Sequence, residues 1–239
     1  AAVVVCDGKT LVIDGGTDEG GDALCAYMRN TLKTEQVDLM IATHPHADHI
    51  GGLSDVLREY TVKKLYSPVD VYDSRTFERM AQYAAAQNLN ITVAQAGQSF
   101  SLGRAKIEIL APLGIYEDIN DISLVAKVTF GETAFLFTGD AERLSEADMV
   151  DSDEDLSATV LKVGHHGSNT SSSYVFLREV MPQYAVISCG KDNKYGHPTE
   201  QTLSRLRQAG VTVYRTDLQG DIICESDGTQ VTFRTARNS

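Results

Sequence analysis

Apolar and polar residues alternate in short blocks along most of the chain, and each block predicts a strand or a helix. Two apolar runs at the start, Val3 to Cys6 and Leu11 to Asp14, flank the turn Asp7-Gly8-Lys9. Asp-Gly between two such runs is a strong signal for a β-hairpin. Further along, the alanine-rich stretch from Ser74 to Gln87 has the spacing and the composition of a long helix.

The same criteria predict strands and helices in alternation through both halves of the chain. We expect further helices at 22–32, 53–58, 173–180 and 198–208 and one beginning near Ala141, and strands at 37–43, 63–67, 91–94, 106–110, 123–130, 133–138, 158–163, 184–188 and near Val211, Asp221 and Gln230. This pattern predicts the α+β class, with two stacked sheets and helices outside them. Because no long linker divides the chain, we expect one domain over residues 1–239. The chain opens inside a strand, so we also expect that residues preceding Ala1 are missing from this segment.

Composition narrows the possible functions. The formal net charge of −12 repels polyanions, which argues against a general nucleic-acid binder with a long footprint. No run approaches the roughly 18 apolar residues of a membrane span, so we expect no transmembrane segment. The chain has four cysteines without a C-x-x-C pair (Cys6, Cys25, Cys189 and Cys224). Free thiols are the favoured state, and two disulfide bonds, as in a secreted protein, are the alternative. A secreted or cell-surface location is favoured over the cytoplasm, and the oligomeric state stays open.

Candidate chemistry begins in a histidine-rich loop. The segment from Thr43 to His49 places His44, His46, Asp48 and His49 within six residues, directly after an apolar strand. Imidazole nitrogen and carboxylate oxygen suit zinc, manganese and iron, and the lack of thiolates argues against a structural zinc clip. We therefore predict a metal centre at this loop.

Three further motifs lie at predicted strand ends. Asp140 follows an apolar strand, where a carboxylate can bridge two cations or cap a helix. The pair His165-His166 is flanked by glycines, which let the backbone approach a ligand closely. His197 precedes Pro198, a favourable first residue of a helix. All six histidines of the chain lie in these motifs and the first loop.

The motifs together resemble the metallo-β-lactamase superfamily, whose αββα sandwich holds metal ions between the edges of two sheets. The resemblance rests on His44-x-His46-x-Asp48-His49 and on Gly139-Asp140, and it spans nearly the whole chain. The motifs Leu11 to Gly16, Val163 to Ser168 and Tyr195 to Pro198 are similar to those of the hydrolase domain of ComEC competence proteins. The resemblance thus implies a four-layer αββα sandwich and a stand-alone relative of that domain.

The resemblance also implies two divalent metal ions, zinc or manganese. It assigns first-site ligands to His44 and His46, second-site ligands to Asp48 and His49, the bridging ligand to Asp140 and a further ligand to His197. The superfamily often has another ligand histidine before the bridging aspartate, but none occurs here between His49 and Asp140. We expect His165 to replace that ligand and His166 to bind or protonate substrate, although the opposite assignment stays open. Asp48 would orient the nucleophile, and Asp14 would orient a ligand histidine.

The implied reaction is hydrolysis by a hydroxide that bridges the two ions. We expect a phosphodiesterase or nuclease acting on a small or short phosphodiester, with single-stranded DNA as one candidate and a phosphorylcholine ester as another. A thioester or lactone hydrolase and a non-catalytic metal-binding module are the alternatives, and the bridging aspartate argues against hydrolysis of β-lactams. Three polar residues after the histidine pair could contact substrate or cap the next helix (Ser168, Asn169 and Thr170).

Overall fold

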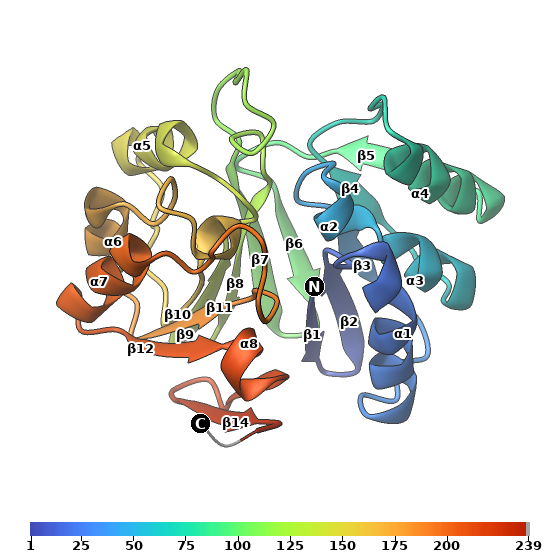
Figure 1. Ribbon diagram of the computed structural model, residues 1–239. Helices are drawn as coiled ribbons and strands as arrows, with labels where there is room; N and C mark the ends of the chain where they lie inside the picture. Colours follow the sequence, from blue (N-terminus) through green and yellow to red (C-terminus); the bar gives the residue numbers. More distant parts are fainter. Residues whose placement is uncertain (238–239) are drawn as a thin grey trace. The chain divides into compact units, whose positions relative to one another are not determined.

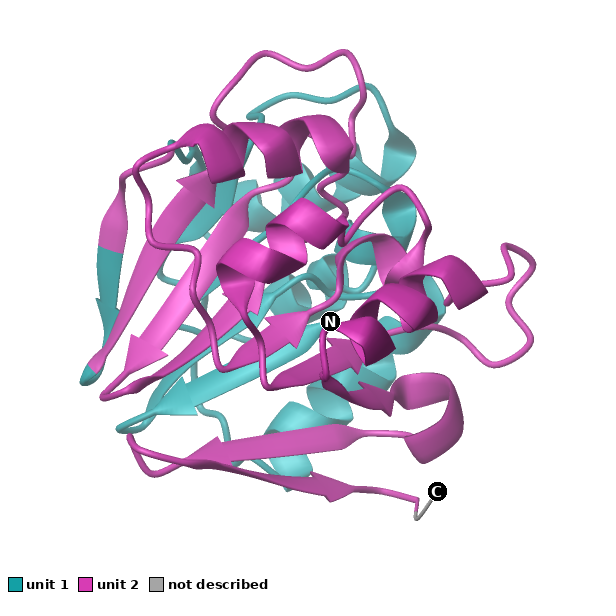
Figure 2. Cartoon of the chain, turned by 90° about the vertical axis from the view of Figure 1, so that its left-hand side faces the viewer, with its two compact units in different colours: residues 1–95, 100–104 teal, residues 96–99, 105–239 magenta. Residues whose placement is uncertain are grey.

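The structure is a computed structural model in which residues 1–237 are described. The chain forms two compact units (Figure 2). Unit 1 comprises residues 1–95 and 100–104, and unit 2 comprises residues 96–99 and the chain from 105 onwards. The division falls within strand β6 (Ser99–Leu102), because Ser99 belongs to unit 2 and residues 100–102 belong to unit 1.

A five-stranded sheet forms the centre of unit 1, with its strands in sequence order. The strands are β1 (Ala2–Cys6), β2 (Lys9–Ile13), β3 (Leu39–Ile41), β4 (Leu65–Ser67) and β5 (Ile91–Val93). β1 and β2 are antiparallel, as the Asp-Gly turn predicted, and the remaining neighbours are parallel. Asp7 and Gly8 have φ values of 49° and 72°, the two left-handed residues that a tight hairpin turn requires.

Helices cover one side of this sheet (Figure 1). They are α1 (Gly21–Asn30), α3 (Leu53–Glu59) and α4 (Arg75–Ala86), with a short 3₁₀ turn at Asp18–Gly20 and the four-residue α2 at Ala47–Ile50. α4 begins where the Ser74 hydroxyl accepts a hydrogen bond from the Phe77 amide. Met28, Met40 and Met80 are fully buried in the core between the helices and the sheet.

Unit 2 contains a larger mixed sheet. Its strands run in the order β12-β11-β10-β9-β8-β7, and a separate hairpin follows near the end of the described chain. The strands are β7 (Ala105–Ala111), β8 (Val125–Phe130), β9 (Thr133–Phe137), β10 (Val160–Lys162), β11 (Tyr184–Ile187) and β12 (Thr212–Arg215), and the hairpin is β13 (Ile222–Ser226) with β14 (Val231–Thr235). β7, β8 and β9 are antiparallel neighbours, and β9 to β12 are parallel. Parallel strands end at the same edge of a sheet, so the loops after β9, β10 and β11 come together there.

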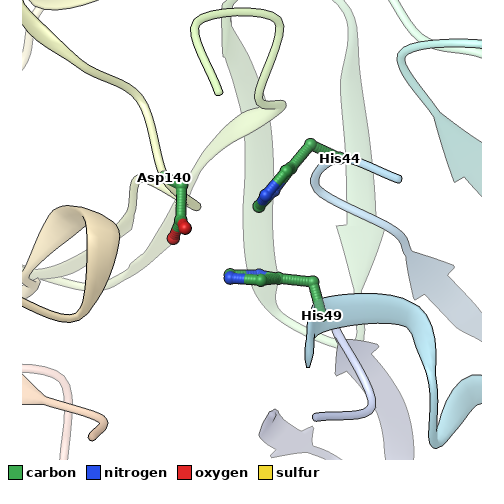
Figure 3. Close-up of side chains that lie close together, drawn as sticks. All are labelled: His44, His49 and Asp140. Carbon is green, nitrogen blue, oxygen red and sulfur yellow. The ribbon is translucent and has the colours of Figure 1, made fainter. Parts of the chain in front are cut away.

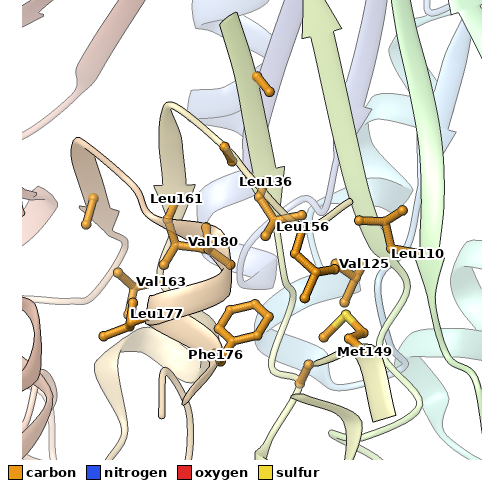
Figure 4. Packing of buried hydrophobic residues seen from close by; sticks show 14 of the residues in the cluster. Leu110, Val125, Leu136, Met149, Leu156, Leu161, Val163, Phe176, Leu177 and Val180 are labelled. Atoms are coloured by element: carbon orange, nitrogen blue, oxygen red, sulfur yellow. The ribbon is translucent and has the colours of Figure 1, made fainter. Parts of the chain in front are cut away.

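The longer helices of unit 2 bury apolar side chains against this sheet, whereas the short helix after β12 has no buried residue. The helices are α5 (Arg143–Asp151), α6 (Tyr174–Val180), α7 (Glu200–Gln208) and the short α8 (Thr216–Gln219). Phe176 and Leu177 of α6 pack in one cluster with Leu136 and Leu161 of the sheet (Figure 4). This core fixes the position of α6, and so of the loop that leads into it.

Two helix starts differ from prediction. α7 begins at Glu200 rather than at Pro198, because the Thr199 hydroxyl accepts a hydrogen bond from the Thr202 amide and so caps the helix. α5 begins at Arg143, two residues later than predicted.

The four cysteines are free thiols, and Cys25 alone of them is buried. No helix among residues 1–237 is long and apolar enough to cross a membrane.

Candidate metal centre

The first cluster of predicted ligands lies in unit 1, where β2 and β3 end. β3 stops at Ile41, and the following loop carries His44 and His46 before α2 begins at Ala47. His44 extends from this loop and His49 from α2 (Figure 3). His44 and His49 are 0% and 4% exposed, whereas His46 is half-buried and Asp48 is exposed. Buried imidazoles need polar partners or a cation to offset their loss of hydration.

Asp14 supplies the partner of His49, as the sequence predicted. Its Oδ2 lies 2.7 Å from Nδ1 of His49 and accepts a 2.8 Å bond from the Thr43 hydroxyl, and its Oδ1 accepts a 2.8 Å bond from the Thr43 amide. Burial alone would raise the pKa of Asp14, but the charge of His49 and its hydrogen bond outweigh burial and hold this pKa below its ordinary value. A carboxylate only accepts, so Nδ1 of His49 donates and Nε2 carries the lone pair that can bind a cation.

His44 and His46 present two nitrogens to one point. Nε2 of His44 lies 3.0 Å from Nδ1 of His46. Two imidazole lone pairs at this separation repel each other unless a proton or a cation lies between them. Two nitrogen ligands of a tetrahedral zinc ion lie about 3.4 Å apart, so the pair fits a shared cation with little adjustment.

The second cluster lies in unit 2, after β9 and β10. Asp140, 2% exposed, comes from the loop after β9 (Figure 3). Its Oδ2 lies 3.8 Å from Nε2 of His165 and 3.7 Å from Nε2 of His166. These distances exceed a hydrogen bond and are a few tenths of an ångström longer than the spacing of about 3.4 Å between two ligands of one tetrahedral ion. The alternative role of Asp140 as a helix cap is wrong, because α5 begins at Arg143 with Glu142 in the capping position.

Different groups anchor the two histidines of this cluster. Nδ1 of His166 lies 2.7 Å from the carbonyl oxygen of Ser188, and Nδ1 of His165 lies 2.8 Å from Oε1 of Glu142. The same Glu142 oxygen accepts a 2.8 Å bond from the Thr170 hydroxyl. The Ser188 carbonyl and the Glu142 carboxylate can only accept a hydrogen bond, so each histidine ring donates through Nδ1. The Nε2 atom of each ring faces Asp140.

The backbone of the histidine pair is strained. His165 and His166 have φ values of 45° and 52°, and Gly167 follows at 84°. Left-handed conformations cost residues other than glycine free energy, so the contacts of the surrounding loop must offset the strain of two such residues in succession. A Cβ on Gly167 would lie 2.6 Å from Cβ of Pro198, so glycine is required there for close packing.

A buried polar network holds the loop that follows the pair. Glu146 of α5 accepts hydrogen bonds from the amides of Ser172 and Ser173, and Nη2 of Arg205 donates to the carbonyl oxygen of Ser171 at 2.8 Å. Burial raises the pKa of Glu146 to about 7, although both amides and the charge of Arg205 oppose that rise. Glu146 of α5 and Arg205 of α7 therefore hold the loop at 171–173 in place from two different helices.

His197 completes the second cluster. Its ring centroid lies 5.7 Å from that of His165, and its Nδ1 is buried with no hydrogen-bond partner among residues 1–237. Burial, and then the charges of His165 and His166, lower the pKa of His197. A neutral imidazole with a buried, unsatisfied nitrogen fits a metal ligand, because a cation satisfies that nitrogen.

A pocket of about 360 Å³ adjoins this cluster. Its lining includes Glu142, Arg143, Asn169 and Thr170. Ser168 and Thr170 bond to each other through their hydroxyls at 2.8 Å, and the cap of α6 is Ser173, so neither of them caps this helix. Thr170 contacts the site through Glu142, a role that local sequence does not indicate.

Comparisons with known proteins identify the family of the chain. Residues 1–191 match the metallo-β-lactamase superfamily. The chain belongs to the metallo-β-lactamase superfamily. Its curated relatives include ComE operon protein 3 of Bacillus subtilis, 32% identical over 79% of this chain and 24% of that protein, and competence protein ComA of Neisseria gonorrhoeae, 33% identical over 89% of this chain and 28% of that protein. The chain therefore spans about a quarter of the length of these relatives.

Solved structures support the same fold. The metallo-β-lactamase fold protein YhfI of Bacillus subtilis superposes with a TM-score of 0.56 over 89% of this chain and 86% of that chain, at 14% identity. The predicted superfamily fold is thereby confirmed. Within unit 1 the structure brings together His44, His46, His49 and Asp14, and within unit 2 it brings together Asp140, His165, His166 and His197.

Two partners of the histidines were not predicted. Glu142 anchors His165 through its side chain, and Ser188 anchors His166 through its main-chain carbonyl. The position of Glu142, two residues after a predicted ligand, is a usable signal for a carboxylate in the site. A main-chain carbonyl carries no sequence signal, so the role of Ser188 follows only from the fold.

Proposed function

We propose that the chain is a metal-dependent phosphodiesterase that uses two divalent ions. The observation that supports this most directly is the orientation of the histidines. Partners on the far nitrogens of His49 and His166 leave Nε2 of each ring as the donor towards a cation. With His44, His46, Asp48, Asp140 and His197 the chain offers enough nitrogen and oxygen donors for two ions, zinc or manganese.

The roles proposed for individual residues in the reaction follow from this set of donors. Two divalent cations, when bound, neutralise charge on the phosphoryl oxygens and activate water as the nucleophile. Asp140 is proposed as the shared ligand, and Asp48 as the carboxylate that orients the attacking water. Asp14 keeps His49 in one tautomer, and its burial excludes water from that hydrogen bond.

The anchors favour one assignment of the adjacent histidines. A main-chain carbonyl holds His166 with a proton on Nδ1, which makes Nε2 a permanent lone-pair donor and suits a metal ligand. A carboxylate holds His165, and a carboxylate can compensate the charge of a ring protonated on both nitrogens. We therefore propose His166 as the ligand and His165, oriented by Glu142, as the group that gives a proton from Nε2 to the leaving oxygen. This is the reverse of the assignment favoured from sequence.

The substrate class rests on two supports. Two ions with a shared carboxylate suit the two charged oxygens of a phosphodiester. One of the curated relatives is named a competence protein, which favours a nucleic-acid phosphodiester over a thioester or a lactone. The net charge of −12 favours a short substrate held at the metal ions over one bound along an extended surface.

The test is hydrolysis of bis(p-nitrophenyl) phosphate by the chelator-treated protein, with zinc or manganese restored. We expect activity that depends on added metal and is lost in Asp140→Ala. Tyr174→Ala is the matched control, because Tyr174 is an exposed residue of α6 outside the predicted ligand set.

Each alternative predicts a different result. A thioester or lactone hydrolase would leave the phosphodiester intact and would cleave an acyl thioester or a homoserine lactone in the same preparation. A non-catalytic module would bind metal and cleave none of these substrates. Full activity in Asp140→Ala would contradict the proposed site.

A further inference from the structure

An exposed aromatic ring lies next to His197 and is not explained by metal binding. Tyr195 is 68% exposed, and its ring stacks on that of His197 with centroids 5.9 Å apart and an angle of 21° between the planes. Nζ of Lys194 lies 5.1 Å from the centroid of the tyrosine ring. Lys191, four residues before Tyr195, is also exposed. The segment thus places an aromatic ring and the ammonium group of Lys194 beside a predicted metal ligand.

Hydrogen bonds hold this segment in place. The Asn193 side chain donates to the carbonyl oxygens of Gly190 and His197, at 3.0 and 2.6 Å, and accepts from the amide of His197 at 3.0 Å. Asn193 therefore fixes the chain on both sides of Tyr195. A ring held in its binding position before the ligand arrives loses little conformational entropy on binding.

The chemistry of the segment selects among phosphodiesters. An exposed aromatic ring next to ammonium groups is typical of proteins that stack nucleobases and contact the neighbouring phosphates. A phosphorylcholine ester would bring a quaternary ammonium to the same ring, where the positive charge of Lys194 repels it. In a duplex the bases already stack on each other and are not available to the ring.

We infer that Tyr195 is a stacking platform for a base of single-stranded nucleic acid, next to the phosphodiester that is cleaved. Lys194 contacts a phosphate of the same strand. This inference rests on the proposed function, since it specifies the substrate of that site. Tyr195 acts on binding, so it lowers KM and leaves kcat nearly unchanged.

Binding and cleavage are measured separately with the full chain loaded with manganese. Fluorescence anisotropy of a labelled oligothymidylate gives Kd, and cleavage of the same oligonucleotide gives KM and kcat. We expect Tyr195→Ala to raise Kd and KM about 5- to 150-fold, as loss of one base–aromatic stack does elsewhere. Tyr195→Phe keeps the ring and should stay within about twofold of the wild type.

Controls separate stacking from a structural effect. Tyr174→Ala removes another exposed tyrosine of unit 2 and should change neither constant. An oligonucleotide with abasic residues around the cleaved bond should abolish the difference between wild type and Tyr195→Ala. Lys194→Gln should lower the slope of log Kd against log salt concentration by about one, the value of one phosphate contact. Metal content equal to that of the wild type shows that His197 is undisturbed in Tyr195→Ala.

The outcomes distinguish this inference from the proposed function. Equal Kd for wild type and Tyr195→Ala would overturn the stacking platform even if the protein cleaves DNA. A similar loss of affinity for duplex and single-stranded DNA would also overturn it. Tyrosine-dependent binding of the oligonucleotide without any hydrolysis would contradict the phosphodiesterase and leave the platform standing.

Discussion

Replacing Asp14 with asparagine isolates the contribution of one carboxylate to the first cluster. Asp14 is 6% exposed and has a φ of 58°, a left-handed conformation that asparagine also adopts readily. The substitution therefore changes charge and hydrogen bonding without a new demand on the backbone. The amide oxygen can still accept from the Thr43 amide, but the NH₂ group then faces the donor Nδ1 of His49.

The size of the effect follows from these contacts. A hydrogen bond to a charged group contributes about 1.5–3 kcal/mol, and a buried donor left without an acceptor costs about 1–3 kcal/mol. A change of tautomer at His49 recovers part of this loss, so we expect the metal-free variant to be less stable by about 2–4 kcal/mol. That corresponds to a fall in Tm of roughly 4–16 °C for a chain of this size.

The change of tautomer has a second consequence. It moves the proton of His49 to Nε2 and so removes the donor towards the cation. We expect metal affinity to fall about 10- to 100-fold, the usual effect of losing a group that orients a ligand histidine. Urea unfolding of the chelator-treated protein measures the first effect, and isothermal titration with zinc measures the second.

Asp7→Asn is the matched control. Asp7 is also left-handed, at φ 49°, and also ion-paired, with Arg104, but it lies exposed in the turn between β1 and β2. A solvated ion pair contributes little, so this variant should resemble the wild type in stability and in zinc affinity. An Asp14→Asn protein with wild-type stability and wild-type zinc affinity would refute the role assigned to this carboxylate.

Three further substitutions test other parts of the account. Glu142→Gln should keep wild-type metal content by elemental analysis and lower kcat on bis(p-nitrophenyl) phosphate about 100-fold or more, as loss of acid catalysis does; loss of metal from this variant would make His165 a ligand instead. Burial raises the pKa of Glu146 to about 7, above the ordinary value of 4.5, so the folded state binds this proton more tightly than the unfolded state. Wild-type stability should therefore fall by on the order of 3 kcal/mol between pH 4.5 and 7, and urea unfolding of Glu146→Gln should show no such fall. Phe176→Ala, in the core of unit 2, should cost about 3–5 kcal/mol in urea unfolding, whereas the exposed Tyr174→Ala should stay within about 0.5 kcal/mol.

Elements with strong local signals were predicted correctly from sequence. The hairpin around Asp7 and Gly8 depends on turn residues, and α4 depends on alanines and on the Ser74 cap, so both are encoded within a few neighbouring residues. The positions of the histidines in the loops that follow strands are local in the same sense. These signals need no knowledge of how distant segments pack.

Features that depend on distant contacts were missed or misplaced. α7 was predicted to begin at Pro198, because the capping contact of Thr199 could not be ranked above the preference of proline for helix starts. β6 was not predicted, since its serines alternate with only two apolar residues. The hydrogen-bond partners of His165 and His166 come from other segments, so they could not be predicted from the local sequence.

The central claim is that the chain binds two divalent ions. Elemental analysis of the manganese- or zinc-loaded protein tests it most directly, with His46→Ala in unit 1 and His166→Ala in unit 2 measured beside the wild type. We predict about two ions per chain in the wild type and fewer in each variant. A wild type that retains no metal after dialysis, or a His166→Ala protein with the full complement, would contradict the claim.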